Sequence, residues 1–270
     1  MSRKKRQADG HDKKKKSSGG LLTAVLLIAI CVFIFSAYQL IMMLIPYYSG
    51  GKEYDKVKKL AITNEKKDPK DTKDGKNGED DGFRVDFNAL LKENPDTVAW
   101  LRFDEPSVIS YPVVKSADNQ EYLTKTFSAN DNKLGAIFMD MRNNSEFTDL
   151  NTFIYGHNLK VGGEMFSQLN EYASEEFCKK HPYFYIYTPK GKLTYQVFSA
   201  STVKDNADNY NLAYATTEDY ANYLQLCRNS SNYQVDVKLD EKSQIVSLST
   251  CTNINDDERF LVQGVLVKSE

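Results

Sequence analysis

The sequence has 270 residues, of which 41% are hydrophobic and 27% charged, as in an ordinary globular protein. Its net charge of −2 hides an asymmetry: residues 1–20 carry eight Lys or Arg against two acids, so the rest of the chain is acidic. An acidic body argues against a nucleic-acid-binding domain. The four cysteines form no CxxC pair, which argues against a zinc site or a thioredoxin-like motif.

The N-terminal part of the chain predicts a membrane anchor. Residues 21–45 form an uncharged, mostly apolar run that is long enough to cross a hydrocarbon core of about 30 Å. A cleaved signal peptide has an apolar stretch of only about 7–15 residues and a small-residue cleavage site, so an uncleaved anchor is favoured. Because the basic residues 1–20 lie only before this run, the positive-inside rule places them in the cytoplasm and the rest of the chain outside.

Residues 46–82 are predicted to form a flexible extracellular tether, and residues 83–270 the folded domain. Residues 66–82 are rich in Lys, Asp, Gly and Asn and cannot bury enough apolar surface to fold. At the start of the tether, a short helix is expected to continue over residues 54–60. In the folded domain, a first helix is expected after a cap at Asp86 and before Pro95.

Runs rich in aromatic and β-branched residues dominate the rest of the folded domain and predict strands. They cover residues 108–114, 136–139, 152–155, 183–187, 193–203, 245–251 and 260–267. Short helices are expected over residues 164–171, 175–180 and 217–227. Many strands with a few interspersed helices predict a mainly β fold, a barrel or sandwich with helical insertions.

Three residues of this domain are candidates for chemistry. His157 follows a predicted strand, directly after Gly156, which would let the chain turn. Cys251 ends a strand whose face it shares with Ser249, a polar setting that suits a reactive thiolate. Arg259 opens the next strand, so a short loop would bring its charge beside Cys251, where it could stabilise an oxyanion. Taken alone, each also fits a structural role, as a loop histidine, a packed thiol or a surface arginine.

Together the three motifs resemble the catalytic motifs of sortases, in the same order. They are YGHN around His157, LSTC ending at Cys251, and DDERF around Arg259. Residues 94–101, 111–123 and 135–143 also resemble that family, so the resemblance covers about residues 83–267. The N-terminal helix, the IFMD stretch followed by RNN, and the long connection over residues 205–240 resemble the class B enzymes in particular.

The resemblance implies an eight-stranded β-barrel and a cysteine transpeptidase of a Gram-positive cell wall. Cys251 would attack a Thr carbonyl in a short sorting signal of the N-P-x-T-N/G kind, His157 would protonate the leaving amine, and Arg259 would hold the oxyanion. An amine of a peptidoglycan precursor would then resolve the acyl-enzyme. The implied partners are secreted proteins with a C-terminal sorting signal, that amine and the membrane, with no nucleic acid, no metal and no cofactor.

Substrate contacts are expected at four positions. Asn119 and Leu123 resemble groove-wall residues of class B enzymes, Ser249 shares the face of Cys251, and Tyr210 lies in the long connection. For each of the four, a place in the core or on the surface remains an open alternative. Two other functions also remain open: a non-catalytic, membrane-tethered binding module, and a hydrolytic cysteine peptidase of the same fold.

Overall fold

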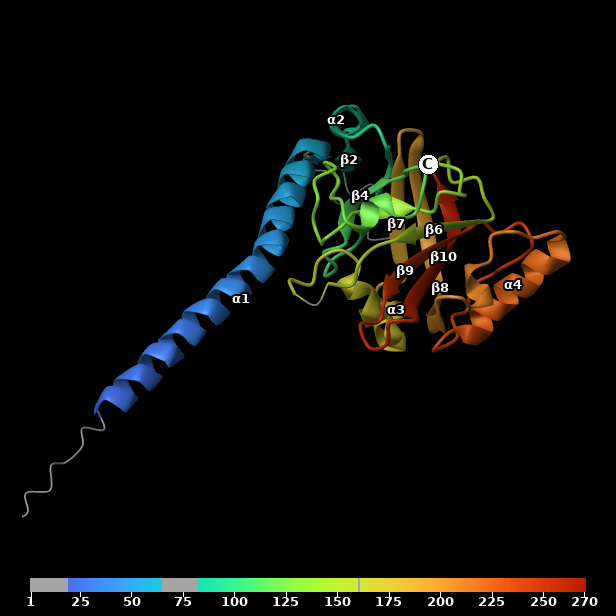
Figure 1. Ribbon diagram of the computed structural model, residues 1–270. Coiled ribbons are helices and arrows are strands. Elements are labelled where there is room, and N and C mark those ends of the chain that lie inside the picture. The colour runs from blue at the N-terminus through green and yellow to red at the C-terminus, as the bar shows by residue number, and fades with distance from the viewer. Residues whose placement is uncertain (1–18, 65–81, 160) are drawn as a thin grey trace, which may run out of the picture. The chain divides into compact units, whose positions relative to one another are not determined.

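The structure is a computed structural model, and it describes residues 19–64, 82–159 and 161–270. It divides into two compact units, residues 1–45 and residues 46–270, each described by itself. The first helix, α1, runs over Gly19–Ala61 and passes through both units (Figure 1). Most of the basic head expected over residues 1–20, and residues 65–81 of the expected tether, lie outside the described residues.

In the first unit, α1 carries the apolar run that was predicted to be an anchor. Its apolar side chains are exposed, Leu21 and Phe33 among them, as they would be on a lipid-facing helix. By length and composition this helix could cross a membrane, since an 18-residue window reaches a mean hydropathy of 2.7.

The start of the second unit differs from the tether expected over residues 46–82. Residues 46–61 continue α1 as a helix, which includes the short helix expected over residues 54–60. Tyr54, Val57 and Ala61 of this segment are buried in the main hydrophobic core. Strand β1, Ile62–Asn64, then pairs antiparallel with β2, Phe83–Val85. The prediction of a tether from residue 46 onward is therefore wrong as far as residue 64.

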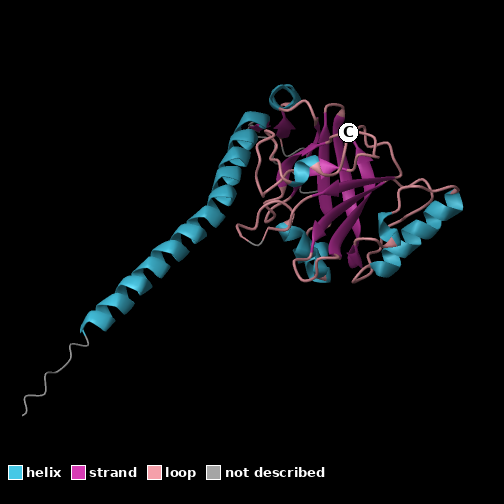
Figure 2. Ribbon diagram, viewed as in Figure 1, coloured by secondary structure: helices cyan, strands magenta, loops and turns pink. Residues whose placement is uncertain are grey.

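The centre of this unit is a closed barrel of eight strands, in the order β10-β8-β7-β3-β4-β5-β6-β9. The strands are β3 (Thr97–Phe103), β4 (Ser110–Val114), β5 (Ile137–Met139), β6 (Asn151–Tyr155), β7 (Tyr183–Thr188), β8 (Gly191–Lys204), β9 (Ile245–Cys251) and β10 (Glu258–Ser269). Neighbours are antiparallel except β4 with β5 and β6 with β9, which are parallel. This confirms the expected eight-stranded, mainly β fold, with the helices on its periphery (Figure 2).

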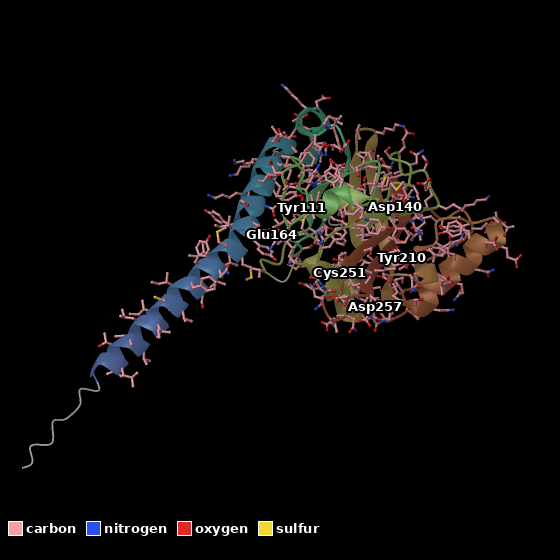
Figure 3. The ribbon with its side chains drawn as sticks, in the orientation of Figure 1. Tyr111, Asp140, Glu164, Tyr210, Cys251 and Asp257 are labelled. Atoms are coloured by element: carbon pink, nitrogen blue, oxygen red, sulfur yellow. The ribbon has the colours of Figure 1, made fainter. Side chains whose placement is uncertain are left out.

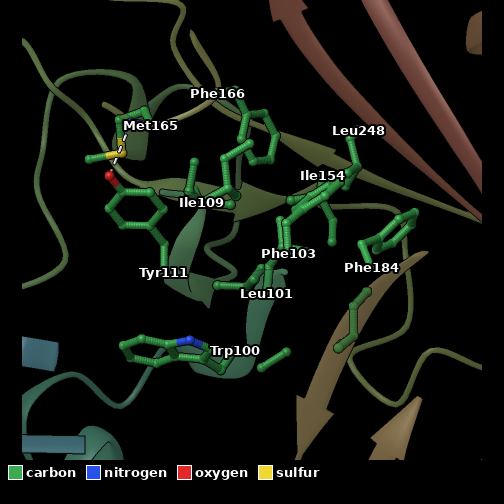
Figure 4. Packing of buried hydrophobic residues seen from close by; sticks show 14 of the residues in the cluster. Trp100, Leu101, Phe103, Ile109, Tyr111, Ile154, Met165, Phe166, Phe184 and Leu248 are labelled. Carbon is green, nitrogen blue, oxygen red and sulfur yellow. Dashed lines mark hydrogen bonds between the residues drawn. The ribbon is translucent and has the colours of Figure 1, made fainter. Parts of the chain in front are cut away.

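Large apolar side chains fill the barrel (Figure 4). Leu101, Phe184 and Leu248 are buried there, from three different strands, and Trp100 is buried on the opposite face of β3. The Trp100 indole donates a hydrogen bond to the Ser110 hydroxyl at 3.0 Å, so its polar atom is satisfied. Close packing of this kind keeps the strand ends, and any side chains that they carry, in fixed positions.

The helices lie where the sequence places them, with one exception. Helix α2, Phe87–Glu93, begins at Asp86, whose carboxylate accepts a hydrogen bond from the Ala89 amide at 3.0 Å. Helices α3, Glu175–Lys180, and α4, Thr217–Ser230, fit the expected ranges. The helix expected over residues 164–171 is instead a 3₁₀-helix, η2, over Ser167–Ala173. Two shorter 3₁₀-helices are η1, Glu121–Leu123, and η3, Asp208–Tyr210.

Candidate active site

The pairing of three strands brings the candidate residues to one end of the barrel. Strands β6 and β9 are parallel, with Tyr155 opposite Ser249, so the residues that follow each strand leave on the same side. His157 and Cys251 each stand two residues beyond that pair. Strand β10 is antiparallel to β9 and places Arg259 opposite Cys251. The prediction that a short loop brings Arg259 beside Cys251 is confirmed.

A pocket forms at this end of the barrel, and all three candidates line it. Its lining residues are Asn119, Leu123, Phe138, Tyr155, Gly156, His157, Ser249, Thr250, Cys251 and Arg259. Figure 3 marks Cys251 within the surrounding side chains. A thiol, an imidazole and a guanidinium therefore line the same pocket, which we call the Cys251 pocket.

The imidazole of His157 is held by the backbone. Its Nε2 lies 2.7 Å from the Leu123 carbonyl oxygen, which can only accept, so Nε2 carries a proton. Nδ1 is then the ring nitrogen left to exchange a proton with a bound molecule. Glycine is needed at position 156 because a side chain would not fit there: a Cβ would clash with the Ile137 side chain and with the Phe166 ring. Its backbone is not in the left-handed region.

Cys251 is partly exposed, at the last position of β9. Asn158, next to His157, donates its side-chain amide to the Cys251 carbonyl at 2.8 Å. The Thr250 hydroxyl donates to the Gly156 carbonyl at 2.7 Å. These two cross-links join the chain around the imidazole to the chain around the thiol, so the two groups keep a fixed separation.

The guanidinium of Arg259 is fixed mainly by its own loop. Nη1 donates to the Asp256 carbonyl at 2.7 Å and to the Glu258 carbonyl at 2.9 Å. Nη2 lies 3.4 Å from an Asp205 carboxylate oxygen. The planar, always charged group is thus oriented before any ligand binds, as a group that stabilises an oxyanion must be.

Of the four residues expected to contact substrate, Asn119, Leu123 and Ser249 line the Cys251 pocket. Tyr210 is not among the lining residues. Its hydroxyl shares a hydrogen bond of 2.7 Å with the Ser249 hydroxyl, and its ring stacks on Phe153 at 5.2 Å. Burial raises the pKa of Tyr210 to about 12, so the phenol stays protonated. The structure thus connects Tyr210 to the pocket through Ser249.

Sequence reasoning missed the carboxylate of Asp140, which holds two residues that line the pocket, Asn119 and Tyr155. Asp140 has a fully buried side chain that accepts from Asn119 Nδ2 at 3.1 Å, from the Tyr155 hydroxyl at 2.8 Å and from Arg142 Nη2 at 2.8 Å. Burial opposes its ionisation, but the hydrogen bonds from Arg142 and Tyr155 outweigh burial, and the pKa of Asp140 is lowered. Two lining residues therefore share one buried anion. The available signal was the Asp-x-Arg spacing after a strand.

The remaining thiols and the other histidine of the folded part lie elsewhere. Cys178 in α3 and Cys227 in α4 are free and buried, as expected for small hydrophobic residues. Burial raises the pKa of the Cys227 thiol to about 11, which makes it unreactive. His181 caps the C-terminal end of α3, and its ring lies 4.8 Å from the Phe177 ring.

Comparisons with known proteins agree with this geometry. Residues 105–267 match the family model of the sortase domain. Sortase B of Listeria monocytogenes is 37% identical over 188 residues, covering 68% of this chain and 75% of that protein.

Among solved structures, sortase B of Bacillus anthracis has a TM-score of 0.70 at 28% identity, covering 83% of this chain and 99% of that one. A sortase B–substrate complex from Staphylococcus aureus has a TM-score of 0.63 at 30% identity, covering 67% of this chain and 84% of that one. With its closed barrel and a pocket that unites a cysteine, a histidine and an arginine, the chain belongs to the sortase family, in its class B, and is a cysteine transpeptidase.

Proposed function

We propose that this enzyme cleaves a short C-terminal sorting signal of secreted proteins after Thr and joins that Thr to an amine of a cell-wall precursor. In this reaction Cys251 is the nucleophile, His157 the proton carrier and Arg259 the oxyanion donor. The observation that carries the proposal is the strand pairing, which gathers these three side chains in one pocket. None of the three is adjacent to another in the sequence, so their convergence is a property of the fold.

The first half-reaction forms a thioester. The Cys251 thiolate attacks the Thr carbonyl carbon, and the carbonyl oxygen takes up the negative charge near Arg259. As the tetrahedral intermediate collapses, the carbon–nitrogen bond of the peptide breaks. The departing amine takes a proton from His157, whose Nδ1 is free for this transfer while Nε2 is bonded to the Leu123 carbonyl.

The second half-reaction reverses these roles. An incoming amine attacks the thioester carbonyl, gives its proton to His157, and expels the Cys251 thiolate. The product is an amide between the Thr and the acceptor, and the enzyme returns to its starting state. In this acyl transfer one amine leaves as another enters and no group is oxidised or reduced, so the three residues need no metal or cofactor for it.

The walls of the pocket suit a short extended peptide. Asn119 and Ser249 offer polar contacts on two sides, while Leu123 offers an apolar one. A sorting signal of the N-P-x-T-N/G kind presents both types of group. The relative from Staphylococcus aureus, 30% identical, was solved as a substrate complex, which supports a peptide-binding role for the same pocket here. Tyr210 would act on the peptide through Ser249.

The proposed setting is the outer face of the cell membrane. The uncharged run at residues 21–45 is the anchor, the basic residues 1–20 stay in the cytoplasm, and the catalytic barrel is outside. Protease added to intact protoplasts should digest the barrel. Protection of the barrel, with digestion only after lysis, would reverse the orientation.

The chemical proposal is tested by trapping the acyl-enzyme. The full chain in detergent is mixed with Thr-containing sorting peptides of the N-P-x-T-N/G kind and followed by intact mass. We expect an adduct of the N-terminal peptide fragment that an added amine releases as a new amide. Cys251→Ala should form no adduct, whereas Cys227→Ala, which removes a buried thiol that does not line the pocket, should form it normally. An adduct that persists in Cys251→Ala, or none in the unaltered enzyme with any such peptide, would contradict the proposal.

A further inference from the structure

The segment of α1 after Pro46 is part of the barrel's packing, although its sequence is mostly polar. Tyr54 is only 3% exposed and its ring lies edge-on to Tyr111, with centroids 5.4 Å apart. Val57 and Ala61 continue the same buried stripe at helical spacing. We call residues 46–61 the 46–61 segment (Figure 1, the paler blue end of α1).

The polar end of Tyr54 reaches a loop that belongs to the active site. Its hydroxyl donates to the Gly135 carbonyl at 2.8 Å and accepts from the Phe127 amide at 3.2 Å. Both partners lie in residues 122–136, which comprise the last two residues of η1 and the connection from η1 to β5, and which we call the 122–136 loop. Burial raises the pKa of Tyr54 well above its usual value, so the hydroxyl keeps its proton and its donor role.

The same loop holds the imidazole of His157. Leu123 supplies the carbonyl that accepts from Nε2 at 2.7 Å. Gly135 has a φ of +62° and packs against the His157 ring and the Leu123 carbonyl. A Cβ at Gly135 would lie 2.8 Å from His157 Cδ2 and 2.9 Å from the Leu123 oxygen. Tyr54 therefore bonds to a residue that touches both the ring and its hydrogen-bond acceptor.

Three more hydrogen bonds fix the loop to the 46–61 segment. The Glu53 carboxylate accepts from the Ser128 amide at 3.0 Å and from Asn130 Nδ2 at 3.1 Å. Asn132 donates its side-chain amide to the Pro46 carbonyl at 2.9 Å. The loop is thus held along most of its length by one helical segment, with Tyr54 at the buried centre.

We propose that Tyr54 is a positioning residue for His157: through the Gly135 and Phe127 backbone it holds the 122–136 loop, and so the imidazole, in the geometry needed for proton transfer. The proposal rests on the proton-carrier role given to His157 above. It makes the 46–61 segment a part of the catalytic apparatus rather than a spacer between anchor and enzyme.

Loss of the hydroxyl alone should then affect chemistry more than binding. Tyr54→Phe keeps the buried ring but leaves the Gly135 carbonyl and the Phe127 amide without their partner, so the loop gains freedom. A misplacement of about 1 Å can cost on the order of 100-fold in rate, and a partial displacement correspondingly less. We expect kcat to fall by about tenfold. KM should change less than kcat, because Tyr54 itself does not line the Cys251 pocket and Leu123 is the one residue of the loop that does.

The experiment uses the full chain in detergent, carrying ¹³C,¹⁵N-labelled histidine. The chain has only three histidines, so their ring signals are few, and His157→Gln assigns the one of interest. Acylation and transpeptidation kinetics are measured on the same samples with an N-P-x-T-N/G peptide. We expect Tyr54→Phe to shift the His157 ring signals and lower kcat. Glu53→Gln, a milder change at the exposed edge of the same contact, should shift them less, in the same direction.

Tyr172→Phe is the matched control. It removes a hydroxyl from an equally buried tyrosine that also donates to a backbone carbonyl, that of His181 at 2.8 Å, away from the pocket. It should leave kcat and the His157 signals unchanged. The proposal is overturned if Tyr54→Phe leaves the His157 signals in place, or if Tyr172→Phe lowers kcat as much. An unaltered enzyme that forms no acyl adduct would instead refute the proposed function, while the ring signals would still report on Tyr54.

Discussion

Arg259 provides the sharpest test of how the pocket works. Both Nη1 hydrogens are used by the Asp256 and Glu258 carbonyls, and one Nη2 hydrogen points to Asp205. Among the described residues, this leaves the Nε hydrogen and one Nη2 hydrogen for an oxyanion. Removal of an oxyanion donor costs about 100- to 1,000-fold in rate, so Arg259→Ala should slow acylation by that factor. Arg259→Lys should recover little, because one ammonium cannot serve both the loop carbonyls and the oxyanion.

A fall in the acylation rate of this size could not come from unfolding of the Arg259→Ala variant. The ion pair of Arg259 with Asp205 is long and partly exposed, so it contributes at most about 1 kcal/mol to stability, and the two carbonyl hydrogen bonds of the guanidinium lie within its own loop. The assay is single-turnover acylation, quenched at set times and read by intact mass, with thermal unfolding measured in parallel. Lys204→Ala is the control, since it removes a neighbouring exposed cation that binds Asp257 at 2.9 Å and does not line the pocket. If Arg259→Ala acylates within about threefold of the original rate, the oxyanion role is refuted.

Two further predictions concern stability. A chain that begins at Gly82 loses the buried side chains of Tyr54 and Val57, whose burial stabilises the fold by about 3–6 kcal/mol. Its Tm should therefore fall by about 10 °C or more. An unchanged Tm would show that the 46–61 segment does not stabilise the barrel. The second prediction concerns how the stability of the fold depends on pH through Asp140, whose pKa is lowered in the folded protein. The ionised carboxylate therefore stabilises the fold fully above the unfolded pKa of about 3.9, and this stabilisation is lost as the pH falls through the lower, folded pKa. Calorimetry should therefore show a Tm deficit for Asp140→Asn near pH 7 that shrinks below about pH 4, and a deficit independent of pH would contradict this reasoning.

The elements with strong local signals could be predicted from the sequence. Strand β9 has the predicted bounds because its run of β-branched and apolar residues stops at Cys251, before a polar loop. Helix α2 starts after Asp86 because a capping carboxylate and apolar spacing agree there. The convergence of His157 and Cys251 could be inferred only through the family resemblance, because parallel pairing of β6 with β9 joins segments about 90 residues apart, as in their Tyr155–Ser249 pair.

The 46–61 segment shows how a structural signal can be masked by composition. Lysines and acids surround it, which favoured a solvated tether, yet Tyr54, Val57 and Ala61 are spaced as one face of a helix. A stripe of three apolar residues is narrow, and it predicts burial only if a matching surface exists. That surface is built by the barrel, which begins at Thr97, and by the 122–136 loop, so the sequence of the 46–61 segment does not reveal it.

The buried polar groups of the pocket wall likewise depend on residues that are distant in the sequence. The Asp-x-Arg spacing could indicate Arg142 as a partner of Asp140, but nothing in the sequence indicates that the carboxylate will also accept from Asn119 and Tyr155. A buried anion is tolerable only when nearly all its acceptor sites are used, so each partner restricts the others. Asn119 is restricted twice, because its own side-chain oxygen also accepts from the Met141 amide at 2.8 Å. The wall that would face the sorting signal is therefore set before the peptide arrives, and a change at Asp140 should alter how tightly the peptide binds more than how fast it is cleaved.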